Sequence, residues 1–178
     1  MRETMMSYID TEIIEALAGR KAHIIIKVNS LSDKEMIKKI YEAAKAGVKV
    51  EMIIRSIYCA TNQKAFDKPI YAISIVDEYL EHARVMYFYN KGENSIYISS
   101  ADWMTRNLDH RIEAAVSIQD KKIKNELLEM LKIQLKGNVK TRILDNKLSN
   151  EYVTNNKPPF RSQIELYRYL KDIASKTE

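Results

Sequence analysis

Two apolar segments that flank one helical pattern constrain the fold of this chain more than any other feature. Residues 22–28 contain three consecutive isoleucines, a β-branched composition typical of a buried strand. A capping box, Ser32-x-x-Glu35, then opens a helix that Gly47 ends, and residues 48–55 follow as a second strand. The inner face of that helix is apolar and consists of Met36, Ile37, Ile40 and Ala44. This succession predicts a parallel pair of strands with a right-handed crossover, and hence an α/β fold.

A β-hairpin is the second clear feature. Residues 85–89 and 96–98 alternate between two sides, and the segment Asn-Lys-Gly-Glu-Asn at 90–94 supplies the turn. One side of the hairpin carries Val85, Tyr87 and Tyr89, and the other carries Met86 and Phe88.

The remaining periodicities complete a mixed β-sheet flanked by helices, which we expect to form a single domain over residues 1–178. Further helices are predicted at 2–18, 70–81, 120–137 and 161–174. Further extended segments are predicted at 112–118 and 139–144, and loops at 56–69 and 145–159. The expected inner faces are Met6, Ile9, Ile13 and Leu17 for the first helix and Ile73, Val76 and Leu80 for the second. Those of the last two helices are Ile123, Leu127, Met130 and Leu131, and Ile164, Tyr167, Leu170 and Ile173.

Composition narrows the class of protein. Cys59 is the only cysteine, which excludes an internal disulfide and suits a reducing cytoplasm. No apolar run approaches the roughly 18 residues that span a bilayer, so we expect a soluble protein. The net charge of +5 arises in one part of the chain: residues 1–117 hold 16 Lys+Arg and 16 Asp+Glu, whereas residues 118–178 hold 13 and 8. This excess suits a polyanionic partner, or it is an ordinary solubilising surface.

Polar side chains gather where the predicted strands end, which is where a rigid scaffold presents chemistry. His82 and Arg84 precede the hairpin, at a predicted helix-to-strand junction. Arg55 ends the second strand, so its cation points into the crevice where α/β folds bind ligands, unless it pairs with Asp77 or Glu81. The segment after the hairpin carries Ser99, Ser100, Asp102, Arg106, Asn107, Asp109 and Arg111.

Other polar or aromatic residues have structural interpretations. His23 sits at the start of an apolar strand, so we interpret it as a surface or structural residue, and His110 lies in a charged cluster, so we interpret it as structural. Trp103 is expected in the core or at a domain contact, not as a platform for base stacking. The chain has no glycine-rich phosphate loop and no His/Cys cluster with metal-ligand spacing.

Three strings carry a resemblance to a known family: SIVDEYLEHARV at 74–85, ISSADWMTRNLDHRIE at 98–113 and LDNKLSNEYV at 144–153. In these the chain resembles polyphosphate kinase, and only its last, C-terminal, phospholipase-D-like domain. The resemblance implies transfer of the terminal phosphate of ATP to inorganic polyphosphate through a phosphohistidine. It also implies that this chain is a fragment of a longer cytoplasmic enzyme, with Met1 at an internal position.

The resemblance implies roles for individual residues. His82 matches the second, non-nucleophilic histidine, the attacking histidine belongs to a preceding domain, and Arg55 matches an arginine that contacts nucleotide phosphates. Mg²⁺ is expected to arrive with ATP, with its protein ligands outside this chain. The implied partners are ATP, ADP, polyphosphate and the preceding domains, with no specific nucleic acid. Homo-oligomers and peripheral membrane association of the full-length enzyme are left open.

His82-x-Arg84 is similar to the H-x-K unit of the phospholipase D superfamily, with two departures. Arg84 stands where lysine is usual, and Tyr89 stands where the motif has aspartate. An arginine keeps the charge and adds a planar fork that binds phosphate oxygens in pairs. The expected supporting residues are Arg84, Ser100, Asp102 and Arg106, with Asp102 orienting either His82 or an arginine.

Two other functions remain open at this point. A phospholipase-D-like phosphodiesterase with one histidine motif per chain completes its site by forming a homodimer, although the missing motif aspartate counts against it. A non-catalytic module binds polyanions through the basic region 118–178, with salt-sensitive affinity.

Overall fold

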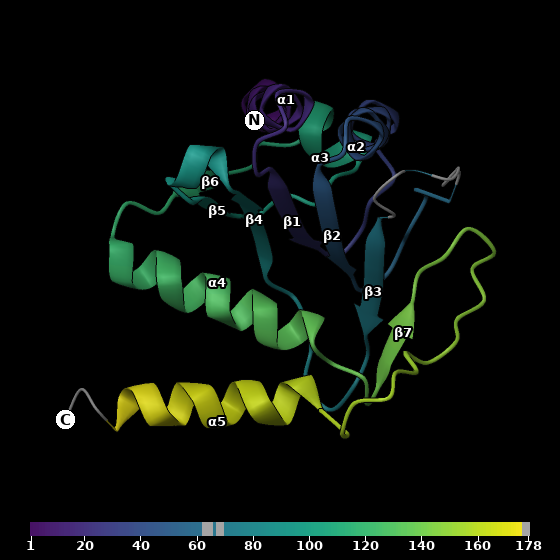
Figure 1. Ribbon diagram of the computed structural model, residues 1–178, viewed down its shortest axis with the longest axis vertical. Helices are drawn as coiled ribbons and strands as arrows, with labels where there is room; N and C mark the ends of the chain where they lie inside the picture. The colour runs from purple at the N-terminus through teal and green to yellow at the C-terminus, as the bar shows by residue number, and fades with distance from the viewer. Residues whose placement is uncertain (62–65, 67–69, 176–178) are drawn as a thin grey trace.

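A computed structural model describes residues 1–61, 66 and 70–175 of the chain. In them, seven strands form one mixed sheet in the order β6-β5-β4-β1-β2-β3-β7 (Figure 1). Strands β1, β2 and β3 are parallel to one another, and every other pairing in the sheet is antiparallel. The strands are β1 (His23–Val28), β2 (Lys49–Ile54), β3 (Tyr71–Ile75), β4 (Arg84–Phe88), β5 (Ser95–Ser99), β6 (Ala115–Ser117) and β7 (Thr141–Ile143).

Helices cover both faces of this sheet, and one of them forms an additional layer. Helices α1 and α2 pack together on one face, while α4 lies on the other face and α5 lies against α4, farther from the sheet (Figure 1). The helices are α1 (Arg2–Leu17), α2 (Lys34–Lys45), α3 (Thr105–His110), α4 (Lys121–Leu135) and α5 (Ser162–Ala174), with a 3₁₀ turn η1 (Asn90–Gly92) in the hairpin. The predicted mixed sheet flanked by helices is confirmed.

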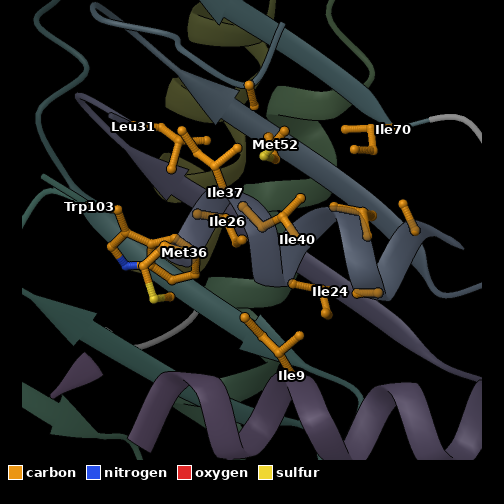
Figure 2. Packing of buried hydrophobic residues seen from close by; sticks show 14 of the residues in the cluster. Ile9, Ile24, Ile26, Leu31, Met36, Ile37, Ile40, Met52, Ile70 and Trp103 are labelled. Atoms are coloured by element: carbon orange, nitrogen blue, oxygen red, sulfur yellow. The ribbon is translucent and has the colours of Figure 1, made fainter. Parts of the chain in front are cut away.

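The main core lies between the sheet and the first pair of helices. Figure 2 shows Ile24 and Ile26 of β1 gathered with Ile9 of α1 and Ile40 of α2, all fully buried. Trp103 is also fully buried in this cluster, as expected. Each such side chain contributes about 1.5–3 kcal/mol through removal of apolar surface from water. This face therefore supplies most of the stability of the fold.

The opposite face is covered less completely. Ile25 of β1 points to this side because side chains alternate along a strand, and it packs in a cluster that includes Leu131 of α4. Helix α5 contacts α4 rather than the sheet, so its apolar side chains Tyr167 and Leu170 are left exposed. The last predicted helix thus exists, but its predicted inner face is not buried.

The sequence predictions for the central elements are confirmed. Strands β1 and β2, the helix between them, their parallel pairing and the β4–β5 hairpin all form. Helix α4 begins after Asp120, whose carboxylate accepts a hydrogen bond from the backbone N–H of Ile123 at 2.9 Å. The predicted strand at 112–118 and extended segment at 139–144 form as the shorter β6 and β7.

The predicted helix at 70–81 is wrong. Residues Tyr71–Ile75 form β3 between β2 and β7, and residues 76–83 form a loop. A strand buried on both faces is a continuous apolar run, and a short run does not distinguish a strand from a helix. Of the predicted helix face, only Ile73 is buried, whereas Val76 and Leu80 are exposed. His82 therefore follows a loop, not a helix.

Two local predictions also need correction. Asp33, not the Ser32/Glu35 box, caps α2, because its side chain accepts the Met36 N–H at 3.1 Å. The inner face of α1 is rotated toward Met5, and Leu17 is exposed. Helix α3 was not predicted. The predicted loop at 56–69 includes residues 62–65 and 67–69, which lie outside the described residues.

Candidate active site

His82 lies on the wall of an open cleft. It belongs to the loop 76–83, which joins β3 to β4, and its ring is exposed. The cleft has a volume of about 650 Å³ and runs between the hairpin, the loop and the helices α4 and α5. Its walls combine charged and apolar side chains, among them Lys27, His82, Arg84, Leu127, Tyr167 and Leu170. The site therefore admits a ligand or a neighbouring protein surface beside the imidazole.

Arg84 fixes one side of the His82 ring. Its Nη1 lies 3.2 Å from Nδ1 of His82, and its Nε and Nη2 atoms contact the two Asp102 carboxylate oxygens at 3.2 and 3.3 Å. Asp102 is itself buried and accepts the backbone N–H groups of Asn29 and Ser30 at 2.7 and 3.2 Å. Of the two sequence-based options, it is the arginine that Asp102 contacts, and the arginine contacts the histidine.

The contact with Arg84 also assigns the ring tautomer. A guanidinium donates hydrogen bonds and does not accept them, so Nδ1 of His82 is the acceptor. In this arrangement the hydrogen of the ring is on Nε2. The ring can therefore present an N–H group to an acceptor in the cleft.

Arg55 lies directly after β2, as predicted, and is half-buried. Its Nε donates to the side-chain oxygen of Asn29 at 3.0 Å. The two carboxylates considered as alternative partners bind elsewhere: Asp77 pairs with Arg161 at 2.7 Å, and Glu81 pairs with Lys27 at 2.6 Å. Arg55 is not among the residues that line the cleft beside His82.

The other expected supporting residues lie outside the cleft lining. Ser100 donates its hydroxyl proton to Glu113 and accepts the Ala114 N–H at 3.0 Å. Those contacts tie the end of β5 to the start of β6, and the hydrogen bond from Ser100 is the largest cause of the lowered pKa of Glu113. Arg106 is an exposed residue of α3. Of the residues expected to act in the site, His82 and Arg84 line the cleft, and Ser99 of the polar segment after the hairpin lines it as well.

A buried polar cluster under the loop was not found from the sequence. Glu81 accepts hydrogen bonds from Lys27 at 2.6 Å, Gln134 at 2.7 Å and Gln163 at 2.9 Å. Burial lowers the pKa of Lys27 despite its pairing with Glu81, and the nearby charge of Arg55 lowers it further. One signal was available: Lys27 is a lone charge inside an isoleucine-rich strand, and such a residue needs a buried partner.

The two other histidines have structural surroundings. His23 Nε2 lies 2.6 Å from the Glu51 carboxylate, at the far end of β1 from the cleft. His110 is the exposed last residue of α3. Neither lines the cleft, in agreement with the sequence interpretation.

Metal and membrane features are absent from the described residues. They contain no group of three or more His, Cys, Asp or Glu side chains placed to hold a metal ion. None of their helices combines the length and the apolar character needed to cross a bilayer.

Comparison with known proteins decides the family. The model of the family described as polyphosphate kinase C-terminal domain 2 matches residues 1–163. The chain belongs to this family. Polyphosphate kinase from Vibrio parahaemolyticus is 45% identical to it over 179 residues, covering 99% of this chain and 26% of that protein. Polyphosphate kinase from Escherichia coli K12 is 40% identical over 175 residues, covering 97% of this chain and 25% of that protein.

Solved structures agree with the family assignment. The crystal structure of polyphosphate kinase from Porphyromonas gingivalis matches with a TM-score of 0.94 and 38% identity, covering 99% of this chain and 27% of that one. A phospholipase D family member, Nuc from Salmonella typhimurium, matches with a TM-score of 0.54 and 17% identity, covering 75% of this chain and 88% of that one. The second match shows that the fold is phospholipase-D-like. The chain spans about a quarter of the length of its polyphosphate kinase relatives.

Proposed function

We propose that residues 1–178 form the C-terminal domain of a longer polyphosphate kinase, which reversibly transfers the terminal phosphoryl group of ATP to inorganic polyphosphate. The single observation that carries this proposal is the exposed imidazole of His82 on an open cleft, oriented by Arg84, in a chain of this family. The domain contributes one histidine, and the preceding part of the enzyme contributes the other.

The reaction proceeds in two steps. In the first, the histidine of the preceding domain attacks the γ-phosphorus of ATP, so that an N–P bond forms while the bond from phosphorus to the ADP oxygen breaks. In the second, a terminal oxygen of polyphosphate attacks the same phosphorus, forming a P–O bond while the N–P bond breaks. Negative charge builds up on the ADP oxygen in the first step, and a positioned donor lowers that barrier.

His82 is that donor. Because Arg84 occupies Nδ1, Nε2 carries the N–H group, and it donates a hydrogen bond to the leaving oxygen. Arg55 neutralises charge on the nucleotide phosphates, to which a guanidinium binds through paired hydrogen bonds. Asp102 holds Arg84 in place, Ser100 supports the end of β5 through Glu113, and the exposed Arg106 adds positive charge.

Magnesium and the remaining partners follow from the proposed reaction. Mg²⁺ enters on the phosphates of ATP, with protein ligands outside this chain. The partners are ATP, ADP, polyphosphate and the preceding domains, and the full-length enzyme works in the cytoplasm. No role for a specific nucleic acid is included.

The test compares ATP-dependent polyphosphate synthesis by the full-length enzyme and by the 178-residue chain alone. We expect synthesis by the full-length enzyme and none by the isolated chain, because the attacking histidine is missing from it. Synthesis by the isolated chain would disprove the proposal that this domain holds only one of the two catalytic histidines. Cleavage of a generic phosphodiester by a dimer of the chain, lost in His82→Ala, would instead support the phosphodiesterase. Salt-sensitive binding of polyphosphate and DNA alike, unchanged in His82→Ala, would support the polyanion-binding module.

A further inference from the structure

The loop that carries His82 is not held in place by apolar packing. Residues 76–83 contain no helix or strand, and the loop exposes its apolar side chains Val76, Tyr79 and Leu80, the last with an exposed fraction of 70%. A loop of this kind samples several conformations unless polar contacts fix it. Its position must therefore come from its polar and charged side chains.

Glu81 supplies the most buried of these contacts. Its carboxylate receives hydrogen bonds from three elements at once: Lys27 of β1, Gln134 of α4 and Gln163 of α5, at 2.6, 2.7 and 2.9 Å. Those three donors are all buried. The acceptor sites of a carboxylate accommodate several donors, so one side chain connects the loop to the sheet and to both helices.

Gln163 holds the same loop at a second point. Its side-chain oxygen accepts the backbone N–H of Tyr79 at 2.9 Å, and its side-chain nitrogen donates to the Tyr79 carbonyl at 2.8 Å. The amide thus fixes the backbone two residues before Glu81 while also contacting its carboxylate. Because Lys27 is buried and charged, it needs the Glu81 carboxylate as a partner, which makes displacement of the loop unfavourable.

His82 follows Glu81 directly. Its backbone therefore starts from an anchored residue, while its ring meets Arg84 on the other side. We propose that Glu81 is a positioning residue for His82, acting through Lys27, Gln134 and Gln163. This inference rests on the proposed function of His82 in phosphoryl transfer. A displacement of about 1 Å in a catalytic group lowers a rate by as much as 10²-fold, so this anchor contributes to turnover without touching the substrate.

The test is Glu81→Gln in the full-length enzyme, with steady-state synthesis of polyphosphate measured per folded enzyme. The amide keeps the size of the side chain but presents an N–H₂ group or a weaker acceptor to Lys27. We expect kcat to fall about 10- to 100-fold while KM for ATP changes by less than about twofold, since the anchor positions the donor and binds no phosphate.

Glu51→Gln is the matched control. Glu51 is a carboxylate of β2 with an exposed fraction of 13%, against 11% for Glu81, and it also pairs at 2.6 Å with a basic side chain, that of His23. It does not line the cleft, and its register partner on β1 is Ile25, two residues before Lys27. We expect kcat of Glu51→Gln to stay within about twofold of the wild type. An equal loss of kcat in both variants would overturn the proposal in favour of a general effect on stability.

If Glu81→Gln does not fold, Gln163→Met tests whether the contacts of the loop position His82. This variant removes two hydrogen bonds to the Tyr79 backbone and one to the Glu81 carboxylate, and it leaves the Lys27–Glu81 pair intact. We therefore expect a smaller fall in kcat, about 3- to 10-fold, with unchanged KM for ATP. Wild-type kcat in the folded variants would overturn the positioning role. If His82→Ala also retained wild-type kcat, the proposed function itself would be wrong, whereas loss in His82→Ala alone would reject only the role of Glu81.

Discussion

The two faces of the sheet are held by different kinds of contact. On the first face, α1 and α2 bury apolar side chains such as Ile9 and Ile40 completely. On the second face, α4 buries little beyond Leu131 and its neighbours, and α5 reaches the rest of the molecule largely through polar contacts of Arg161 and Gln163. Apolar packing dominates on the first face, whereas the second face combines a smaller apolar cluster with hydrogen bonds and ion pairs that hold α5 and the loop 76–83.

This difference assigns most of the stability to the first face and the candidate active site to the second. Apolar contacts have no direction and tolerate small shifts, whereas hydrogen bonds fix atoms at defined distances and angles. On the second face the atoms must be held at defined positions because the loop 76–83 on this face carries His82. It also leaves the cleft open, since the apolar residues of α5 are not folded against the sheet.

The largest expected effect on stability belongs to the first face. Ile40→Ala leaves a cavity in a fully packed cluster and should lower the free energy of unfolding by about 2–5 kcal/mol. Urea unfolding of the chain, followed by circular dichroism, measures this change. A loss below about 1 kcal/mol would show that this face is not the main source of stability.

A smaller effect is expected where β1 meets the hairpin. Asp102→Asn weakens its hydrogen bonds to the Asn29 and Ser30 N–H groups and removes the ion pair with Arg84, for a loss of about 1.5–3 kcal/mol. Turnover of the full-length enzyme should fall as well, because Arg84 loses its orientation. Asp109→Asn, at a more exposed carboxylate, is the control. Equal turnover in the two variants would argue against a role for Arg84.

The contribution of the N-terminal end of α5 to the stability of the fold should depend on pH. Arg161 donates to Asp77 and holds the pKa of that carboxyl below its usual range. The pair therefore stabilises the fold above the unfolded pKa of about 3.9, and this contribution is lost as the pH falls through the lower folded value. The Tm difference between the wild type and Asp77→Asn should be present at pH 7 and shrink below about pH 4. A difference that does not depend on pH would contradict this assignment.

The smallest effect is expected on the exposed side of α5. Leu170 has an exposed fraction of 44%, so Leu170→Ala should change the free energy of unfolding of the chain by less than about 0.5 kcal/mol. Urea unfolding beside Ile40→Ala tests the contrast between the two faces directly. A loss comparable with that of Ile40→Ala would mean that α5 is packed as tightly as α2.

Local pattern predicted much of the fold. The sequence was sufficient to predict strand β1, helix α2, strand β2 and the hairpin. In these elements the spacing of apolar residues and the residues that end each element match the burial found in the folded chain. Strand β3 was read as a helix because its apolar residues are buried on both faces, a fact that depends on β2 and β7 lying beside it. The exposed side of α5 was read as buried because periodicity does not reveal whether a partner is present.

The site was predicted in part. His82 and Arg84 stand where the hairpin begins and Asp102 stands just after it ends, and the structure joins them by hydrogen bonds. The cluster around Glu81 combines side chains from β1, α4 and α5 that are up to 136 residues apart, from Lys27 to Gln163. Such contacts form only when the chain folds, so they cannot be predicted from the pattern of any one short segment.

The most direct test of the central claim is the turnover of His82→Ala in the full-length enzyme, with His23→Ala as the control. His23 is an imidazole paired with Glu51 away from the cleft, so its loss should leave polyphosphate synthesis per folded enzyme close to the wild type. We predict that His82→Ala lowers that rate by about 10²- to 10⁴-fold, the usual contribution of a positioned proton donor. A folded His82→Ala enzyme with wild-type turnover would contradict the assignment of His82 to the phosphoryl-transfer site.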